Sequence, residues 1–204
     1  MITKICKNIK PPERIPILQA IFDTICVKYG ITNTNDQAAF AAQICHESGE
    51  FSIKTESMLY RTAKRLVTIW PKRFSLDGSG GKHKASDYLN NEAKLANEVY
   101  AGRMGNGDKA SGDGFRFRGA GFLQMTGRDD FEKYANYIGK EIGEASELVR
   151  NDDNYAMDAA AWEYVIKNKL LGQEDFRHIT VVINGDVTGL EERTKYYNKA
   201  LAAV

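Results

Sequence analysis

Apolar residues recur at three- and four-residue intervals in several stretches of the chain, which is the spacing of one face of an α-helix. Residues 14–29 carry this pattern, and Gly30 ends it. A second run extends to Glu47, and Asn33, Thr34 and Asn35 are its potential N-caps. Further elements are predicted over residues 62–70, 86–100, 128–137, 154–170, 175–184 and 190–204. The pattern therefore predicts a mainly helical protein, with about seven or eight helices.

The stretch 102–121 interrupts the helical pattern because it contains seven glycines. It cannot form a regular helix, and it is too long for a simple connection. Its glycines allow tight turns and a close approach of the backbone to a ligand. Phe115, Phe117 and Phe122 prefer burial, which argues against a disordered linker. We expect at most a small β-hairpin, near residues 115–125.

Composition places the chain among ordinary globular proteins. Its 204 residues suit one domain with room for two lobes, and 43% of them are hydrophobic and 27% charged. A net charge of +1 argues against a general nucleic-acid binder. The sequence contains no run of eighteen apolar residues, so we do not expect stable insertion into a membrane.

The first sixteen residues lack the apolar core and small-residue cleavage site of a secretory signal peptide. They predict a product that accumulates in the cytoplasm. Three cysteines cannot all pair, and Cys26 and Cys45 lie in apolar helical stretches. We therefore expect Cys6, Cys26 and Cys45 to be reduced residues rather than a disulfide or a metal cluster.

Two carboxylates stand out in the segment 41–60. Glu47 is predicted in the last turn of a helix, because Gly49 follows it closely. The negative end of the helix dipole lies there, and it favours the protonated acid. Glu56 lies beyond the break, in different surroundings. Two such carboxyl groups are the minimum apparatus for glycoside hydrolysis, although a chain with 27 acidic residues contains many pairs at this spacing.

Other catalytic classes have weaker support in the sequence. His46-Glu47 begins a zinc-protease motif, but HExxH requires a second histidine where this chain has Glu50. The three histidines are widely separated, so no metal or other cofactor is expected. His46 is interpreted as a packed helix residue. Cys45 precedes it directly and cannot face it on a helix, so Cys/His catalysis is not expected.

Four segments are similar to glycoside hydrolase family 19, in its bacterial and bacteriophage endolysin branch, which is related to plant chitinases. They are HESGEF (46–51), the segment 56–74 that ends in WPKRF, the block 100–131 that contains GDGFRFRGAGFLQMT, and INGDVTGLEERTKYY (183–197). The resemblance implies a single catalytic domain over residues 1–204, with no separate wall-binding module. It also implies a lysozyme-like helical fold of two lobes around a glycan-binding cleft.

The same resemblance implies roles for individual residues. Glu47 matches the general acid, and Glu56 the base that activates water. Thr126 matches a hydroxyl that helps to hold this water, and Gln124 an amide that contacts substrate. The remaining matches, to groups around the cleft, are Asn184, Arg193, Tyr60, Phe117 and Arg118.

An inverting mechanism, which the resemblance implies, makes a geometric prediction. Water must fit between the carboxyl groups, so their separation should be roughly 6.5–9.5 Å. An unbroken helix would place residues 47 and 56 about 13 Å apart, so the break at Gly49 is needed. A nearby arginine is expected to hold Glu56 ionised while Glu47 stays neutral.

The sequence departs from the family pattern at two positions. Ala120 stands at a usual arginine, which removes one possible donor to the glycan. Asp130 stands at a frequent substrate-binding asparagine, and an acidic residue there suits a chitin chain less well. The sequence therefore predicts a monomeric endolysin that cleaves β-1,4 bonds of peptidoglycan glycan strands. It would wait in the cytoplasm until a holin releases it to the host periplasm. The alternatives are a chitinase and an inactive glycan-binding protein that keeps Gln124 and Arg193.

Overall fold

The computed structural model describes residues 1–203 and divides the chain into two compact units. Unit 1 consists of Met1–Thr55, Gly119–Met125 and the chain from Tyr134 onward. Unit 2 consists of Glu56–Arg118 and Thr126–Lys133. The predicted mainly α class is confirmed, because helices account for nearly all regular structure in both units.

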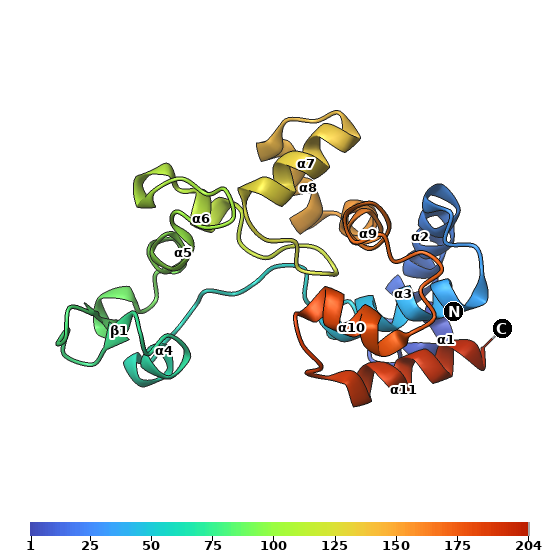
Figure 1. Ribbon diagram of the computed structural model, residues 1–204, viewed down its shortest axis with the longest axis horizontal. Coiled ribbons are helices and arrows are strands. Elements are labelled where there is room, and N and C mark those ends of the chain that lie inside the picture. Colours follow the sequence, from blue (N-terminus) through green and yellow to red (C-terminus); the bar gives the residue numbers. More distant parts are fainter. Residues whose placement is uncertain (204) are drawn as a thin grey trace. The chain divides into compact units, whose positions relative to one another are not determined.

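Unit 1 is built from helices that come from both ends of the chain (Figure 1). α7 (Arg128–Ile138) begins in unit 2 and ends in unit 1. The other elements are α1 (Ile2–Ile5), α2 (Arg14–Tyr29), α3 (Thr34–Glu47), α8 (Ile142–Asn151), α9 (Asp153–Trp162), the π-helical turn η3 (Glu163–Lys167), α10 (Phe176–Asn184) and α11 (Leu190–Leu201).

α3 is the buried centre of unit 1. The side chain of Asn33 accepts a hydrogen bond from Asp36 N at 2.8 Å, so the helix begins as predicted. Alanines at four of its positions let neighbouring helices approach, and Phe40 fills the space against Phe22 and Tyr164. α10 and α11 lie beside α3 (Figure 1). This packing brings residues of the C-terminal segment to the end of α3.

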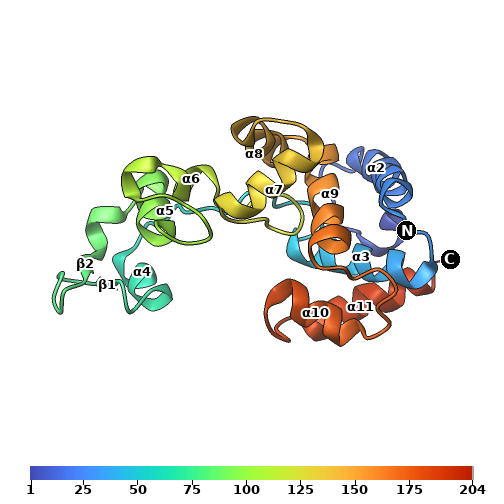
Figure 2. The same cartoon turned by 45° about the horizontal axis from the view of Figure 1, so that its top comes forward.

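α9 packs on α2 (Figure 2). The helix is capped by Asp152, whose carboxylate accepts from Asn154 N at 2.7 Å, and Trp162 near its end is buried. α8 was not predicted. Its apolar face is short, and only Ala145, Ser146 and Val149 are buried on it.

The expectation of reduced cysteines is wrong for two of the three. Cys6 and Cys45 form a disulfide, and buried Cys26 is the free thiol. Cys6 follows α1 directly, and α1 is anchored through buried Ile2 and Ile5. This packing sets the two Cα atoms 6.8 Å apart, at the upper end of the distances that a disulfide spans. The two cysteines are 39 residues apart in the sequence, so no local pattern could predict that they pair.

Unit 2 is built around an aromatic and aliphatic core, in which Met58, Leu66, Phe74 and Tyr88 are buried. Its elements are α4 (Ala63–Ile69), β1 (Phe74–Ser75), β2 (His83–Lys84), the 3₁₀ turn η1 (Ala85–Tyr88), α5 (Glu92–Tyr100), the 3₁₀ turn η2 (Lys109–Ser111) and α6 (Asp113–Arg116). α4 ends before Pro71, as predicted.

Two boundaries in this unit differ from the sequence expectation. The helix predicted from Ser86 begins only at Glu92, because Asn91 caps it by accepting from Lys94 N at 2.9 Å. The preceding residues form η1 instead, which turns the Tyr88 ring onto Phe74, with ring centres 5.0 Å apart.

The β-structure is as small as expected but lies elsewhere. The only strands among residues 1–203, β1 and β2, are two residues long and pair in parallel, on either side of residues 76–82. In the segment predicted as a hairpin, the structure has a single antiparallel bridge between Ala120 and Met125.

Asp113 organises the glycine-rich stretch. Its buried carboxylate accepts from Gly107 N at 2.9 Å and from Arg128 Nε at 2.8 Å. The Arg128 guanidinium is the main reason that the pKa of Asp113 lies below its usual value. A Cβ at Gly114 would lie 2.5 Å from Ala96 O, so this glycine serves the packing of α6 on α5.

No helix within residues 1–203 combines the length and the apolar character that crossing a bilayer requires.

Candidate active site

Glu47 is the last residue of α3, as predicted. The helix stops there because Gly49, Glu50 and Phe51 all have left-handed backbone conformations, with φ between 53° and 64°. Ser48 secures the turn, since its Oγ accepts from Phe51 N at 2.8 Å and donates to Ile44 O at 2.6 Å. Two consecutive non-glycine residues at positive φ are costly. This strained turn fixes the helix end that carries the carboxylate.

Arg193 of α11 holds the Glu47 carboxylate. Its Nη2 donates to Glu47 Oε1, and its Nη1 donates to Gln43 Oε1 at 2.5 Å. Gln43 in turn donates to Thr180 Oγ1 at 3.0 Å, and Thr180 is itself bonded to Phe176 O. Arg193 is 1% exposed, whereas the Glu47 side chain is 20% exposed. A buried chain of hydrogen bonds across α3, α10 and α11 therefore orients one partly accessible carboxylate.

Asn184 shapes the turn that leads into α11. Its Nδ2 donates to Asp186 Oδ1 at 2.8 Å and to Thr188 O at 3.3 Å. The turn ends at Gly189, where a Cβ would lie 2.6 Å from His46 Nε2. Asn184 thus positions the backbone that packs against His46 and Arg193. His46 is a packed residue, as expected, and its burial and the charge of Arg193 lower its pKa.

Gln124 occupies a tight turn of unit 1. Its backbone is left-handed (φ 56°), and its Nε2 donates to Gly121 O at 2.8 Å. Ala120 N donates to Met125 O at 3.0 Å across the base of this turn. A non-glycine residue in this conformation is strained, which is frequent at functional positions. Ala120 itself is fully buried and bridges to Thr55, so this position does not present a side chain to solvent.

Glu56, the second predicted carboxylate, belongs to unit 2 and is held by a tyrosine. Tyr100 Oη lies 2.8 Å from Glu56 Oε1 and 3.0 Å from Oε2. Burial and the charge of Glu56 raise the pKa of Tyr100, so this hydroxyl keeps its proton and acts as a donor. Tyr60 is half-buried and packs its edge against Trp70, with ring centres 5.4 Å apart.

The other predicted site residues of unit 2 differ in their burial and in their contacts. Thr126 is half-buried. Arg118 folds over the ring of Phe115, with its guanidinium carbon 3.9 Å from the ring centre. Phe117 was predicted to contact substrate, and this is wrong, because its side chain is 0% exposed. It packs against Phe131 and beneath Arg128, so it supports the glycine-rich stretch from within.

Arg193 hydrogen-bonds a carboxylate of the predicted site, which agrees with its matched role. Its side chain is buried, so it can act on substrate only through its neighbours. The arginine expected beside Glu56 stays a prediction. The sequence alone could not pair Arg193 with Glu47, because α11 reaches the end of α3 across 146 residues.

Sequence reasoning missed Gln43, Thr180 and Tyr100. Gln43 had a usable signal, since it lies four residues before Glu47 and therefore on the same helix face. Thr180 and Tyr100 had none, because each reaches its partner through tertiary packing. Within residues 1–203, no cluster of three or more His, Cys, Asp or Glu side chains has the geometry to hold a metal ion.

A separate cavity of about 580 Å³ lies in unit 1, between α2 and α9. Lys28, Tyr137, Asn154 and Asp158 are among its lining residues, and none of the predicted site residues lines it. Asp158 is fully engaged there by Lys28, by Tyr29 Oη at 2.8 Å and by Tyr134 Oη at 3.0 Å. This carboxylate is therefore a structural group.

The helical scaffold and the two carboxyl groups, each oriented by a hydrogen-bonding side chain, are typical of hydrolases that use acid–base chemistry. No family model matches the sequence. A protein of Haemophilus influenzae, described as a glycosyl hydrolase family 19 domain-containing protein, is 33% identical over 198 residues, which cover 97% of this chain and 94% of that protein. At this identity and coverage, the chain belongs to glycosyl hydrolase family 19, and it is a glycoside hydrolase.

A solved structure agrees at the level of the fold. It is a family GH19 class IV chitinase from Zea mays, which aligns with a TM-score of 0.54 and 16% identity. The alignment covers 97% of this chain and 82% of the maize chain.

Proposed function

We propose that this protein cleaves the β-1,4 bonds of peptidoglycan glycan strands by an inverting mechanism, with Glu47 as acid and Glu56 as base. The arrangement around Glu47 carries the proposal. Arg193 engages Oε1 from the buried side, while the carboxylate remains partly accessible at a helix end. A group held in this way can deliver a proton in one fixed direction.

The proposed reaction combines two proton transfers. Glu47 donates its proton to the leaving glycosidic oxygen as the bond to the anomeric carbon breaks. Glu56 removes a proton from water, whose oxygen forms the new bond on the opposite face of the sugar. Tyr100 orients the Glu56 carboxylate, and Thr126 is proposed to hold the water. The products together contain one added water molecule. After the reaction Glu47 is ionised and Glu56 is protonated, and proton exchange with solvent restores both groups.

The test compares clearing of peptidoglycan sacculi by the wild type with that by Glu47→Gln and Glu56→Gln. Removing an essential acid or base should lower the rate by about 10²–10⁴-fold. Matched controls are Glu13→Gln in unit 1 and Glu132→Gln in unit 2, which change exposed carboxylates and should keep full activity. Near-normal clearing by Glu47→Gln would contradict the proposed roles. Binding without clearing by the wild type would favour the glycan-binding alternative.

Two product measurements sharpen the assignment. Mass spectrometry of digested peptidoglycan identifies the sugar at the new reducing end and hence the bond that is cut. The anomeric configuration of the fresh product, followed by NMR before mutarotation, should be inverted. A retained configuration would contradict the predicted separation of roughly 6.5–9.5 Å between the two carboxyl groups.

Chitin is the second candidate substrate, because the maize structure is described as a chitinase. Parallel assays on sacculi and on soluble chitin oligosaccharides decide between them. We expect clearly faster cleavage of peptidoglycan. Faster cleavage of the chitin oligosaccharides would assign the protein to the second class.

We further propose that the protein acts as a monomer in host lysis, and reaches the wall from the cytoplasm through a holin-dependent lesion. The Cys6–Cys45 disulfide supports action in an oxidising compartment such as the periplasm. Thiol labelling of cytoplasmic and released protein tests this. Both cysteines should react only before release, and an oxidised pair in the cytoplasm would contradict the order of events.

A further inference from the structure

Unit 2 carries a strongly basic segment, residues 61–84, which is made of α4, β1, β2 and the turns around them. It contains seven Lys and Arg residues but only one acidic residue, Asp77. Unit 2 as a whole has 14 Lys and Arg against 10 Asp and Glu, a net charge of +4. Unit 1 has 14 against 17, a net charge of −3. The near-neutral total therefore hides a local concentration of positive charge.

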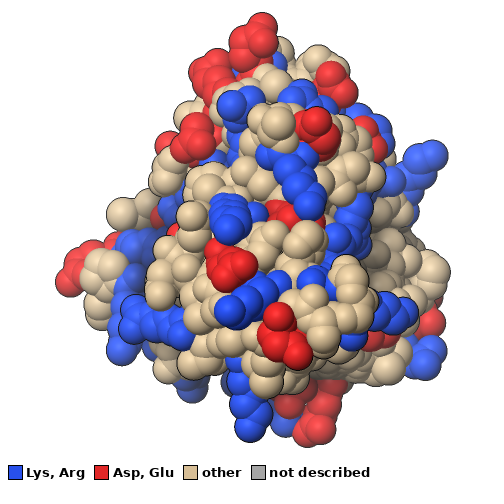
Figure 3. All heavy atoms as spheres, turned by 90° about the vertical axis from the view of Figure 1, so that its left-hand side faces the viewer, with Lys and Arg blue, Asp and Glu red and all other residues tan. Residues whose placement is uncertain are grey.

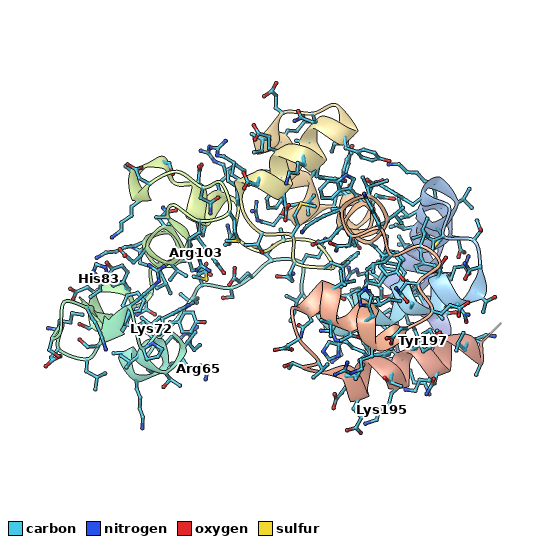
Figure 4. The ribbon with its side chains drawn as sticks, in the orientation of Figure 1. Arg65, Lys72, His83, Arg103, Lys195 and Tyr197 are labelled. Carbon is cyan, nitrogen blue, oxygen red and sulfur yellow. A yellow bond between two sulfur atoms is a disulfide. The ribbon has the colours of Figure 1, made fainter. Side chains whose placement is uncertain are left out.

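The cations of the basic segment are available to a partner. Six of them are exposed, and these six form no ion pair with any other residue that the structure describes. Arg65 and Lys72 lie on α4 and just after it (Figure 4). Figure 3 shows Lys and Arg side chains spread over one face, with Asp and Glu side chains and uncharged surface between them. The six exposed cations are Arg61, Lys64, Arg65, Lys72, Lys82 and Lys84.

An aromatic hollow lies among these cations. Ile69, Trp70, Pro71, Lys72 and Arg73 line a depression of about 340 Å³. Trp70 is half-buried, so part of its ring faces outward, while its other side packs on Tyr60 and Phe74. An indole ring beside ammonium and guanidinium groups suits a ligand that combines apolar and anionic parts.

The basic segment is continuous with the predicted general base. Glu56 lies four residues before Tyr60, and the Tyr60 ring contacts Trp70 at the hollow. Both Glu56 and Arg65 act electrostatically on the Tyr60 hydroxyl, which places the Glu56 carboxylate and the Arg65 guanidinium near the same tyrosine. A polymer bound along the segment would therefore lead towards Glu56.

The geometry points to carboxylate-bearing glycan as the ligand of the basic segment: we propose that Arg61–Lys84 binds the free carboxylates of the stem peptides of peptidoglycan. This inference rests on the proposed function and names the feature by which the enzyme prefers peptidoglycan. Chitin carries no carboxylate and gains nothing from these cations. A lipid surface fits less well, because Leu76 is the only large hydrophobic residue of the segment that is highly exposed.

The experiment measures binding in a Glu47→Gln background, so that the substrate is not consumed. The test variant adds Arg65→Gln, Lys72→Gln and Lys82→Gln. The matched control adds Lys7→Gln, Lys169→Gln and Arg177→Gln, which remove the same charge from exposed positions of unit 1. Thermal melts establish that both variants fold like their parent. The probes are peptidoglycan sacculi, sacculi with carboxylates amidated by carbodiimide coupling, insoluble chitin and anionic phospholipid vesicles.

We expect the test variant to bind sacculi about tenfold more weakly than the parent, since three exposed charge contacts of modest strength are lost. The control variant and chitin binding should be unchanged. Amidated sacculi should bind the parent as weakly as intact sacculi bind the test variant. Salt should remove the difference as the Debye length falls from about 10 Å at 0.1 M to about 3 Å at 1 M.

Equal losses in test and control variants, or full binding to amidated sacculi, would overturn the inference. Tighter binding to anionic vesicles than to sacculi would also overturn it. These outcomes are separable from failure of the proposed function. If the wild type failed to clear sacculi but the charge-dependent binding persisted, the hydrolase assignment to peptidoglycan would fall and the binding inference would stand.

Discussion

The two predicted catalytic carboxylates are held in contrasting ways by the two units. In unit 1, Glu47 is bonded to a buried guanidinium, which is itself fixed through Gln43 and Thr180. In unit 2, Glu56 accepts from one tyrosine hydroxyl that is shared between its two oxygens. Both are hydrogen bonds to a carboxylate, but only the bond to Glu47 joins two charged groups. The contrast teaches that a buried cation of the core orients one carboxylate, whereas a neutral tyrosine is one of the groups that orient the other.

The largest expected effect comes from Arg193→Met, which removes the cation and leaves Gln43 and Glu47 without their partner. Breaking a buried pair from one side costs about 3 kcal/mol or more, so the free energy of unfolding should fall by that amount. Activity on sacculi should fall by at least about 10²-fold because the proton donor is no longer oriented. Guanidinium unfolding and clearing assays measure the two effects.

The control is Arg177→Gln on α10, an exposed arginine. It should change neither stability nor activity. An Arg193→Met protein with normal stability would show that the buried network does not hold the end of α3.

Asp113→Asn tests the corresponding charged pair of unit 2. We expect a loss of about 2 kcal/mol in unfolding free energy, less than for Arg193 because the Arg128 side chain is 33% exposed. The folded-state pKa of Asp113 is lowered, so its stabilisation is present above the unfolded value of about 3.9 and is lost as pH falls through the folded pKa.

Thermal melts of wild type and Asp113→Asn between neutral pH and pH 3 measure this. The two proteins should converge in acid, and Asp87→Asn, an exposed change, should follow the wild type throughout. A constant difference at all pH values would contradict the electrostatic origin of the stabilisation.

Tyr100→Phe tests the weaker restraint on Glu56. Deleting one hydroxyl should cost about 1 kcal/mol of stability and lower activity roughly tenfold, since the carboxylate loses its neutral donor. Steady-state kinetics should show the loss mainly in kcat. An activity loss as large as that of Arg193→Met would remove the contrast between the two units.

His46 supplies the smallest predicted effect. Burial is the main reason that the folded-state pKa of His46 lies below its usual value, and the charge of Arg193 lowers it further. As pH falls through the unfolded pKa of about 6.5, the unfolded state takes up a proton that the folded state resists, so stability falls. His46→Gln should flatten this part of the stability profile between pH 7 and pH 5. An unchanged slope would show that other groups control it.

Local sequence determined much of the fold. α2, α3, α4, α7, α9 and α11 lie close to where apolar periodicity, caps and a terminating glycine or proline placed them. Each of these signals acts within one or two helical turns, so neighbouring residues suffice to read it. The resemblance to family 19 was carried by four short segments, and the curated relative confirms the family. The roles of Glu47, Glu56 and Thr126 stay predictions.

Only the tertiary structure decided which distant groups meet. It paired Arg193 with Glu47, joined Cys6 to Cys45 and buried Phe117. It also set Tyr100 on Glu56. The physical reason is that such pairs depend on how whole helices dock, and docking follows from the summed shape and polarity of their faces. A periodic pattern shows that a face is buried but leaves open which partner covers it.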